Sequence, residues 1–231
     1  LRGRELEEMK TKENGVPEVL PVLPVQESVL FPRMIIPLMI RDEASVQLVD
    51  EALQSDKLIA VSLIQEAEDP ETDPEGVYDV GTVGQIVKLN KGEEGTMVAV
   101  QGLARIGIGE AVATEPYIKA RVWELQEKQQ KDQELDAMTA NAQGLFKLIV
   151  DLSPYLPQEL AQAARNVREA GPLADLIVST LNLDRYKKQE ILECLDVKER
   201  MSLLTVFLNE ELELQKMGQK IQDKVKEGME K

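Results

Sequence analysis

Apolar and polar residues follow one period in the first part of the chain and another in the second. Up to about residue 125, short β-branched runs are separated by turn-forming residues, and eight of the 11 prolines lie there. This texture is typical of strands joined by tight turns. Pro21, Pro24 and Pro37 fall inside the first two strands, which we therefore expect at an edge or with a bulge. The expected strands are residues 19–25, 34–40, 58–65, 77–89, 96–111 and 117–125.

Helical spacing interrupts this pattern once and then dominates the rest of the chain. Val46, Val49 and Leu53 predict one helix between the second and third strands, and from residue 135 onward apolar residues recur at steps of three and four. Proline and glycine mark the expected helix ends, with Pro157 opening one helix and Gly171-Pro172 closing it. The expected helices are residues 43–54, 135–152, 157–170, 174–181, 185–195 and 196–231.

Six short strands with one helical crossover, followed by helices alone, predict an α+β fold in two lobes. The β-rich lobe should be a closed or half-closed barrel, and the second lobe a helical bundle that ends in a long projecting helix. The expected boundaries are a flexible lead-in over residues 1–16, the β-rich lobe over residues 17–126 and the helical lobe over residues 127–231.

The last expected helix is longer than its lobe requires. Asp196 and Glu199 resemble a capping box, and a helix over residues 196–231 would exceed about 45 Å at 1.5 Å per residue. Beyond residue 212 its apolar positions narrow to the seam of a coiled coil. We expect this seam to meet a neighbouring subunit or the next domain, the alternative being a helix that frays into solvent. Its members are Leu214, Met217, Ile221 and Val225.

Charge and composition exclude several classes of function. The 231 residues include 27 basic and 42 acidic side chains, and the net charge of −15 argues against binding to nucleic acid or anionic membranes. There is no histidine and one cysteine, Cys194, so neither a Ser-His-Asp triad nor a multi-cysteine zinc site can form. No apolar run is long enough for a membrane span, and a lone cysteine fits a reducing compartment. We therefore expect a cytoplasmic protein without a metal.

Enzymatic motifs are absent as well, so no catalytic or cofactor-binding residue is assigned. No G-x-x-x-x-G-K-[ST], G-x-G-x-x-G or G-x-S-x-G motif occurs. The pattern favours binding, because residues 96–100 read TMVAV and are apolar on both faces of a strand. Either the second face packs under the helix or the helical lobe, or it forms an exposed patch that receives unfolded peptide. The candidate substrate-binding residues are Met34, Met39, Met97 and Ala99.

Several segments together resemble one family. Residues 20–53 read LPVLPVQESVLFPRMIIPLMIRDEASVQLVDEAL, and Phe31-Pro32 and Ile36-Pro37-Leu38 follow the order found at the opening of Lon proteases. Further similar segments follow in register, namely YDVGTVGQIVKL, VAVQGLARIGI, PLADLIVSTLNL and KKQEILECLDVKERM. The close, KIQDKVKEGMEK, is similar to the stretch leading into the family's AAA+ module. The resemblance covers residues 17–231 in unbroken order.

The resemblance implies the substrate-recognition region of an ATP-dependent serine protease. It implies a PUA-like barrel, a helical lobe and a helix joining them to an AAA+ ATPase and a protease domain. The Ser–Lys dyad and the site for ATP and Mg²⁺ would lie outside this chain, which itself would be no enzyme and need no cofactor. The implied partners are unfolded or damaged proteins and further copies of the chain, typically in a hexamer that degrades misfolded and regulatory proteins.

Two other functions are kept as alternatives. A stand-alone Lon-N-like substrate adaptor would have both lobes without a protease, although cereblon-type adaptors add a cysteine-rich zinc module that one cysteine cannot supply. A PUA-type RNA-binding module is the third class, and the net charge of −15 argues against it.

Overall fold

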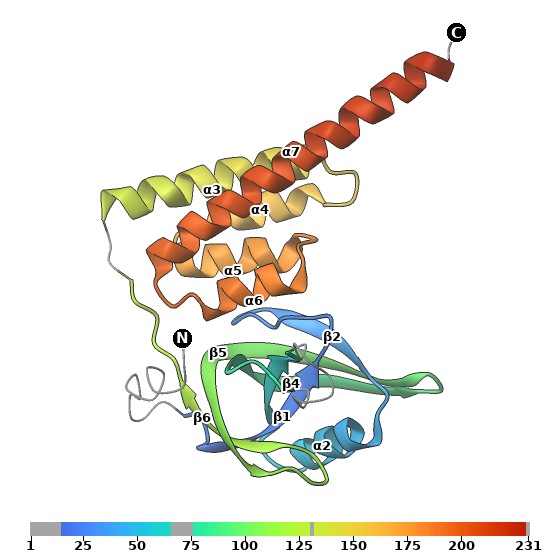
Figure 1. The fold of residues 1–231 in the computed structure, drawn as a ribbon, viewed down its shortest axis with the longest axis vertical. Coiled ribbons are helices and arrows are strands. Elements are labelled where there is room, and N and C mark those ends of the chain that lie inside the picture. The colour runs from blue at the N-terminus through green and yellow to red at the C-terminus, as the bar shows by residue number, and fades with distance from the viewer. Residues whose placement is uncertain (1–14, 66–75, 130–131, 230–231) are drawn as a thin grey trace. The chain divides into compact units, whose positions relative to one another are not determined.

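The structure, a computed structural model, confirms the α+β fold, with a six-stranded sheet and helices in the part of the chain that it describes (Figure 1). The described residues are 15–65, 76–129 and 132–229. The expected lead-in over residues 1–16 lies outside them apart from its last two residues. In the described ranges, no helix combines the length and the apolar character that crossing a membrane requires.

The sheet closes on itself. The strand order is β2-β5-β4-β3-β1-β6, and β5 also pairs with β6. Five strands therefore form a closed barrel, and β2 extends the sheet beyond β5. Closure removes the free edges of the barrel strands and leaves β2 as an edge. The strands are β1 (Val19–Val25), β2 (Ile35–Ile40), β3 (Leu58–Leu63), β4 (Val80–Gly92), β5 (Gly95–Ala113) and β6 (Lys119–Glu124).

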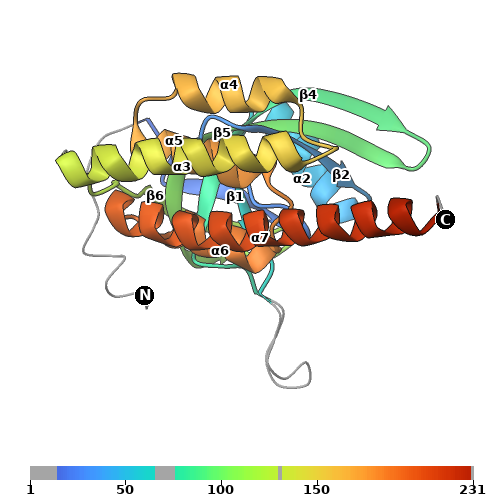
Figure 2. The same ribbon diagram turned by 90° about the horizontal axis from the view of Figure 1, so that it is seen from above.

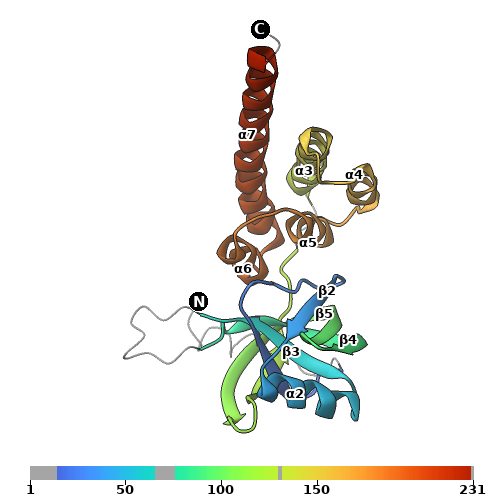
Figure 3. The same ribbon diagram turned by 90° about the vertical axis from the view of Figure 1, so that its right-hand side faces the viewer.

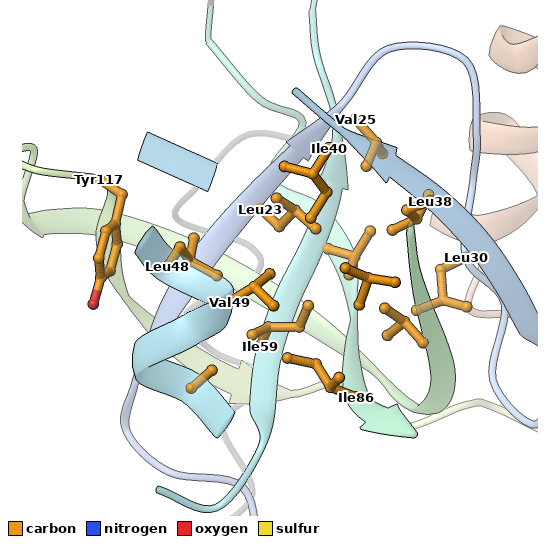
Figure 4. Close-up of a cluster of buried hydrophobic side chains, with 14 residues drawn as sticks. Leu23, Val25, Leu30, Leu38, Ile40, Leu48, Val49, Ile59, Ile86 and Tyr117 are labelled. Carbon is orange, nitrogen blue, oxygen red and sulfur yellow. The ribbon is translucent and has the colours of Figure 1, made fainter. Parts of the chain in front are cut away.

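Two apolar cores lie on opposite faces of this sheet. The first fills the barrel, because all five barrel strands contribute to it. The second lies between the other face and α2 (Glu43–Leu53), from which Val49 points toward Ile59 of β3 (Figure 4). The barrel core consists of Leu20, Val22, Ala60, Val83, Ile106, Ile108, Ala120 and Val122.

The prolines of β1 do not place it at an edge, so that expectation is wrong for this strand. β1 lies between β3 and β6, but it pairs with β6 only through its first three residues and with β3 only from Val22 onward. Val22 donates its N–H to the Ile118 carbonyl on the β6 side (2.8 Å), and successive N–H groups point to opposite sides. The missing donors of Pro21 and Pro24 therefore fall where no ladder runs. Pro37 does lie in the edge strand.

The boundary between the two compact units differs from the expected one. The sheet unit includes residues 182–195, which we expected in the helical lobe. Polar contacts explain this: the Gln189 side-chain amide of α6 (Arg185–Glu193) donates to the Val80 carbonyl (2.9 Å). The Arg105 Nε of β5 donates to the Leu192 carbonyl (2.9 Å). The units are Leu1–Glu127 with Asn182–Leu195, and Lys128–Leu181 with Asp196–Lys231.

The described part of the helical unit contains four helices. In it α3 and α7 run side by side (Figure 2), and α5 packs against both. Figure 3 shows α3, α4 and α5 close to end-on. A buried ion pair joins Arg200 of α7 to Asp175 of α5, with Nη1 and Oδ1 3.6 Å apart. These helices are α3 (Gln133–Leu152), α4 (Gln158–Asn166), α5 (Ala170–Thr180) and α7 (Val197–Met229).

One helix boundary in this unit was predicted wrongly. The expected helix over residues 157–170 ends at Asn166, and Gly171-Pro172 lies in the first turn of α5 instead of after a helix. Proline is tolerated there because the first N–H groups of a helix have no partner within it. The side-chain amide of Gln143 donates to the carbonyls of Ala164 (3.1 Å) and Val167 (3.0 Å), which holds the break between the two helices.

Candidate functional site

Two strands at the free edge of the sheet expose apolar side chains. β2 and β5 pair antiparallel, so that Met39 lies opposite Met97 and Pro37 opposite Ala99. Because side chains alternate across a strand, these four residues share one face, which we call the outer face. Met39 and Met97 are 42% and 36% exposed. Three of the four candidate residues named from the sequence are thus brought together.

The opposite face of the same strands belongs to the second core. Val98 and Val100 of β5 are fully buried, and Leu38 and Ile40 of β2 are buried beside them. α2 packs on the face of Val98 and Val100, whereas Met97 on the outer face keeps more than a third of its surface exposed.

Met34, the fourth candidate, does not belong to the outer face. It is half-buried in the turn before β2, where its carbonyl accepts the N–H of Gly102 (2.8 Å). Gly102 is required at this approach, because a Cβ there would lie 2.2 Å from the Phe31 carbonyl oxygen. The Met34 carbonyl thus helps to fix the start of β2.

Two exposed residues of the outer face were missed from the sequence. Ile35 is 59% exposed and shares the parity of Met39 along β2, so the alternation within IIPLMI was a signal for it. Val87 is 46% exposed because of a β-bulge in β4 between Ile86 and Lys88. At the bulge two consecutive side chains, those of Val87 and Lys88, are both exposed. No sequence signal placed that bulge.

Polar groups frame the outer face without covering it. Lys88 of β4 lies opposite Ala99 and is exposed. Just after β2, the Arg41 Nε donates to the Glu94 carbonyl in the β4–β5 turn (3.2 Å). These contacts tie the ends of three strands together, so the apolar side chains stand on a backbone whose conformation is already fixed.

A second polar cluster joins α2 to the segment before β6. The Tyr117 hydroxyl donates to the Glu51 carboxylate, and the Lys119 ammonium lies 5.0 Å from the centre of the Tyr117 ring. Burial and the bond to Glu51 raise the pKa of Tyr117. The same bond, with one from Gln47, lowers the pKa of Glu51. The cluster anchors α2, and nothing in it points to a reaction.

The end of α7 carries the second group of residues named from the sequence. Leu214, Met217, Ile221 and Val225 are 63%, 57%, 62% and 56% exposed. Their spacing of three, four and four residues places them on one side of the helix. We call these four residues the α7 seam, and no described part of the chain buries them.

The first half of α7 behaves differently. The Asp196 carboxylate caps the helix by accepting the N–H groups of Lys198 (2.9 Å) and Glu199 (3.1 Å). One stripe of apolar residues up to Leu212 is then buried in the helical unit, whereas Val206 on another side of the helix is 52% exposed. At about 100° per residue, this buried stripe lies roughly a third of a turn from the α7 seam, so the seam does not continue it. The stripe consists of Val197, Met201, Leu204, Leu208 and Leu212.

The chemistry available in the described residues is that of binding. They contain no group of three or more histidine, cysteine, aspartate or glutamate side chains placed to hold a metal ion. Cys194 follows α6, is half-buried and forms no disulfide. Exposed apolar side chains on a rigid sheet face can bind apolar segments of another chain, because removing such surface from water is favourable.

Comparison with solved structures supports the fold. The N-terminal domain of Mycobacterium avium complex Lon protease superposes with a TM-score of 0.69 at 24% identity, over 83% of this chain and 98% of that one. The Lon N-terminal domain protein from Xanthomonas campestris gives 0.58 at 17% identity, over 81% and 97%. At these identities the likeness shows a shared fold alone.

Comparison of sequences identifies the family. The Lon proteases of Dictyoglomus thermophilum and Syntrophus aciditrophicus are 44% and 42% identical over 218 and 222 residues, in each case 94% of this chain. The chain spans 27% and 28% of their lengths. The family model of the ATP-dependent protease La (LON) substrate-binding domain matches residues 19–210, well over half of the chain. The chain therefore belongs to the Lon substrate-binding domain family.

Proposed function

We propose that the outer face of β2 and β5 binds unfolded polypeptide for an ATP-dependent Lon protease that degrades misfolded and regulatory proteins. The observation that supports this most is the exposed Met39–Met97 pair, which lies on strands whose other face is buried in the second core. Flexible, polarizable methionine side chains adapt to many apolar sequences, which suits a surface that must accept unrelated substrates. A folded protein hides its apolar segments and should bind weakly.

A titration with one protein in two states tests this proposal. Reduced, carboxymethylated lactalbumin should bind the chain, and native lactalbumin should not. Met97→Glu places a charge on the outer face and should weaken binding about tenfold, the effect of losing roughly 1.4 kcal/mol. Val112→Glu is the matched control, because Val112 is also an exposed apolar residue of β5 (49%) but lies far beyond Met97 along the strand. Equal binding of both forms of lactalbumin would contradict the proposal.

We also propose that the α7 seam contacts a neighbouring subunit or the next domain of the whole protein. The whole protein would be a cytoplasmic homo-oligomer, hexameric as in the family. Its AAA+ and protease domains would supply ATP hydrolysis and peptide cleavage. What supports it is a row of four apolar side chains, each more than half exposed, on a helix otherwise crowded with charge. Exposed apolar rows of this kind mark interaction surfaces.

Variants of the full-length protein test the α7 seam. Ile221→Asp should impair assembly or the degradation of folded substrates, because it places a charge in an apolar contact. Gln219→Asp is the control, since Gln219 is exposed on roughly the opposite side of the same turns. Sedimentation velocity and degradation assays report the outcome. If Ile221→Asp assembles and degrades like the parent protein, the seam is not an interface.

A further inference from the structure

The free edge of β2 has a hydrogen-bonding pattern that fits an added strand. The Met34 carbonyl accepts the N–H of Gly102 of β5 (2.8 Å), so Met34 faces β5 at the start of the β2–β5 ladder. Main-chain groups of an antiparallel strand point alternately toward and away from the partner. Ile36, Leu38 and Ile40 therefore face β5, whereas the main-chain groups of Ile35, Pro37 and Met39 face outward.

Pro37 agrees with this assignment and reduces the number of hydrogen bonds that the edge can form. A proline in a sheet has no N–H to donate, and it is tolerated where that position faces solvent. In the described part of the chain, β2 pairs with no strand other than β5. The edge therefore offers two outward N–H groups, of Ile35 and Met39, and three outward carbonyls, with one donor missing between them.

We propose that an extended segment of unfolded polypeptide adds to β2 as a further strand, with its apolar side chains on the outer face beside Met39. This inference rests on the proposed function and adds the mode of binding. Main-chain hydrogen bonds are independent of sequence, so strand addition explains how one surface accepts unrelated substrates. The missing donor at Pro37 keeps the ladder short and the complex weak, and it opposes edge-to-edge pairing of two copies.

Amide hydrogen exchange gives a direct test. The probe is a ten-residue peptide of alternating valine and threonine with a lysine at each end, since the chain carries a net charge of −15. Saturating peptide should slow exchange at Ile35 and Met39 by about tenfold or more, whereas the Ile36 and Leu38 amides already face β5 and should change little. The same peptide with every interior amide N-methylated keeps its side chains but loses its donors, and it should not bind.

Three variants separate main-chain from side-chain binding. Met39→Pro and Met39→Ala both remove the methionine side chain, but only the proline removes the outward N–H. Met39→Pro should bind the peptide about fivefold more weakly than Met39→Ala, the effect of one net hydrogen bond. Pro37→Val restores a donor and should tighten binding about fivefold. Pro37→Val keeps the test decisive if Met39→Pro fails to fold.

The outcomes are distinct. Peptide that shifts the methyl resonances of Met39 and Met97 without slowing exchange at Ile35 and Met39 would overturn strand addition and leave the proposed function standing. Peptide that produces neither change would remove strand addition, and absent binding of unfolded lactalbumin would remove the proposed function with it. Slow exchange at Ile35 and Met39 that depends on protein concentration without peptide would assign the edge to a second copy of this chain.

Discussion

The outer face and the α7 seam are both exposed and apolar, yet they are supported in different ways. Met39 and Met97 stand on strands whose other face, at Val98 and Val100, is fully buried. The α7 seam stands on helical turns beyond Leu212 in which the side chains described up to residue 225 are exposed, apart from the half-buried Gln215. The backbone under the outer face is fixed by neighbouring strands, whereas the backbone under the seam depends on its own helical hydrogen bonds.

This difference indicates different partners. A surface on a rigid sheet is already formed before a ligand arrives, so it can bind and release substrates without refolding. A helix segment without tertiary contacts is marginal in water, because most helical stability in proteins comes from packing of an apolar face. The seam thus gains most from a lasting partner. The following changes test that contrast, beginning with the largest expected effect.

Asp175→Ala should destabilise the helical unit by about 3–5 kcal/mol, because it leaves the charge of Arg200 buried without this carboxylate. Asp175→Ala with Arg200→Met removes both charges and should recover most of the loss. Amide exchange resolved by residue measures the effect in each unit. If the strands of the sheet unit open together with the helices, the two units are not independent in stability.

Leu208→Ala should cost about 2–5 kcal/mol, whereas Ile221→Ala should cost less than about 0.5 kcal/mol. Leu208 is fully buried and Ile221 is 62% exposed, although both lie on α7. Urea denaturation of the two variants measures the difference. Truncation after residue 212, like Ile221→Ala, should leave the midpoint of urea denaturation almost unchanged. A large loss in Ile221→Ala would show that the seam already packs within this chain.

Gly102→Ala should destabilise the sheet unit by about 1–3 kcal/mol, since the new Cβ would meet the Phe31 carbonyl oxygen at 2.2 Å. Gly144→Ala is the matched control in α3, where a Cβ meets nothing within 4 Å. Because alanine favours a helix over glycine, this control should stabilise by up to about 1 kcal/mol. Shifts of the thermal midpoint in opposite directions for the two variants would show that the sheet unit cannot accommodate an added Cβ at the start of β2.

Glu193→Gln should raise the midpoint at pH 7 by a small amount. Burial raises the pKa of Glu193 on α6, although a bond from Gln189 opposes the shift. A carboxyl with a raised pKa in the folded state contributes stability below its unfolded pKa and loses it as the pH rises through the folded value. The variant should therefore match the parent near pH 4, where the carboxyl is largely protonated, and exceed it at pH 7. A constant difference across pH would exclude ionisation as the cause.

Local patterns were sufficient for much of the fold. Each of the six strands lies where β-branched runs predicted one, and the bounds of β1 agree to the residue. The patterns failed at Gly171-Pro172, because proline fits both the end of one helix and the first turn of the next. The end of α4 at Val167, and the hydrogen bond that the Gln143 side chain donates to the Val167 carbonyl, decide that Gly171-Pro172 begins a helix here.

The sequence by itself determined the two-lobe α+β organisation, the apolar residues of β2 and β5 and the length of α7, because period and turn residues act over short distances. The tertiary structure alone decided which lobe holds α6, through Arg105 and Gln189. It also decided that β1 is internal despite two prolines and that a bulge turns Val87 outward. Each of these depends on which strands become neighbours, a property of contacts far apart in the chain that no local period encodes.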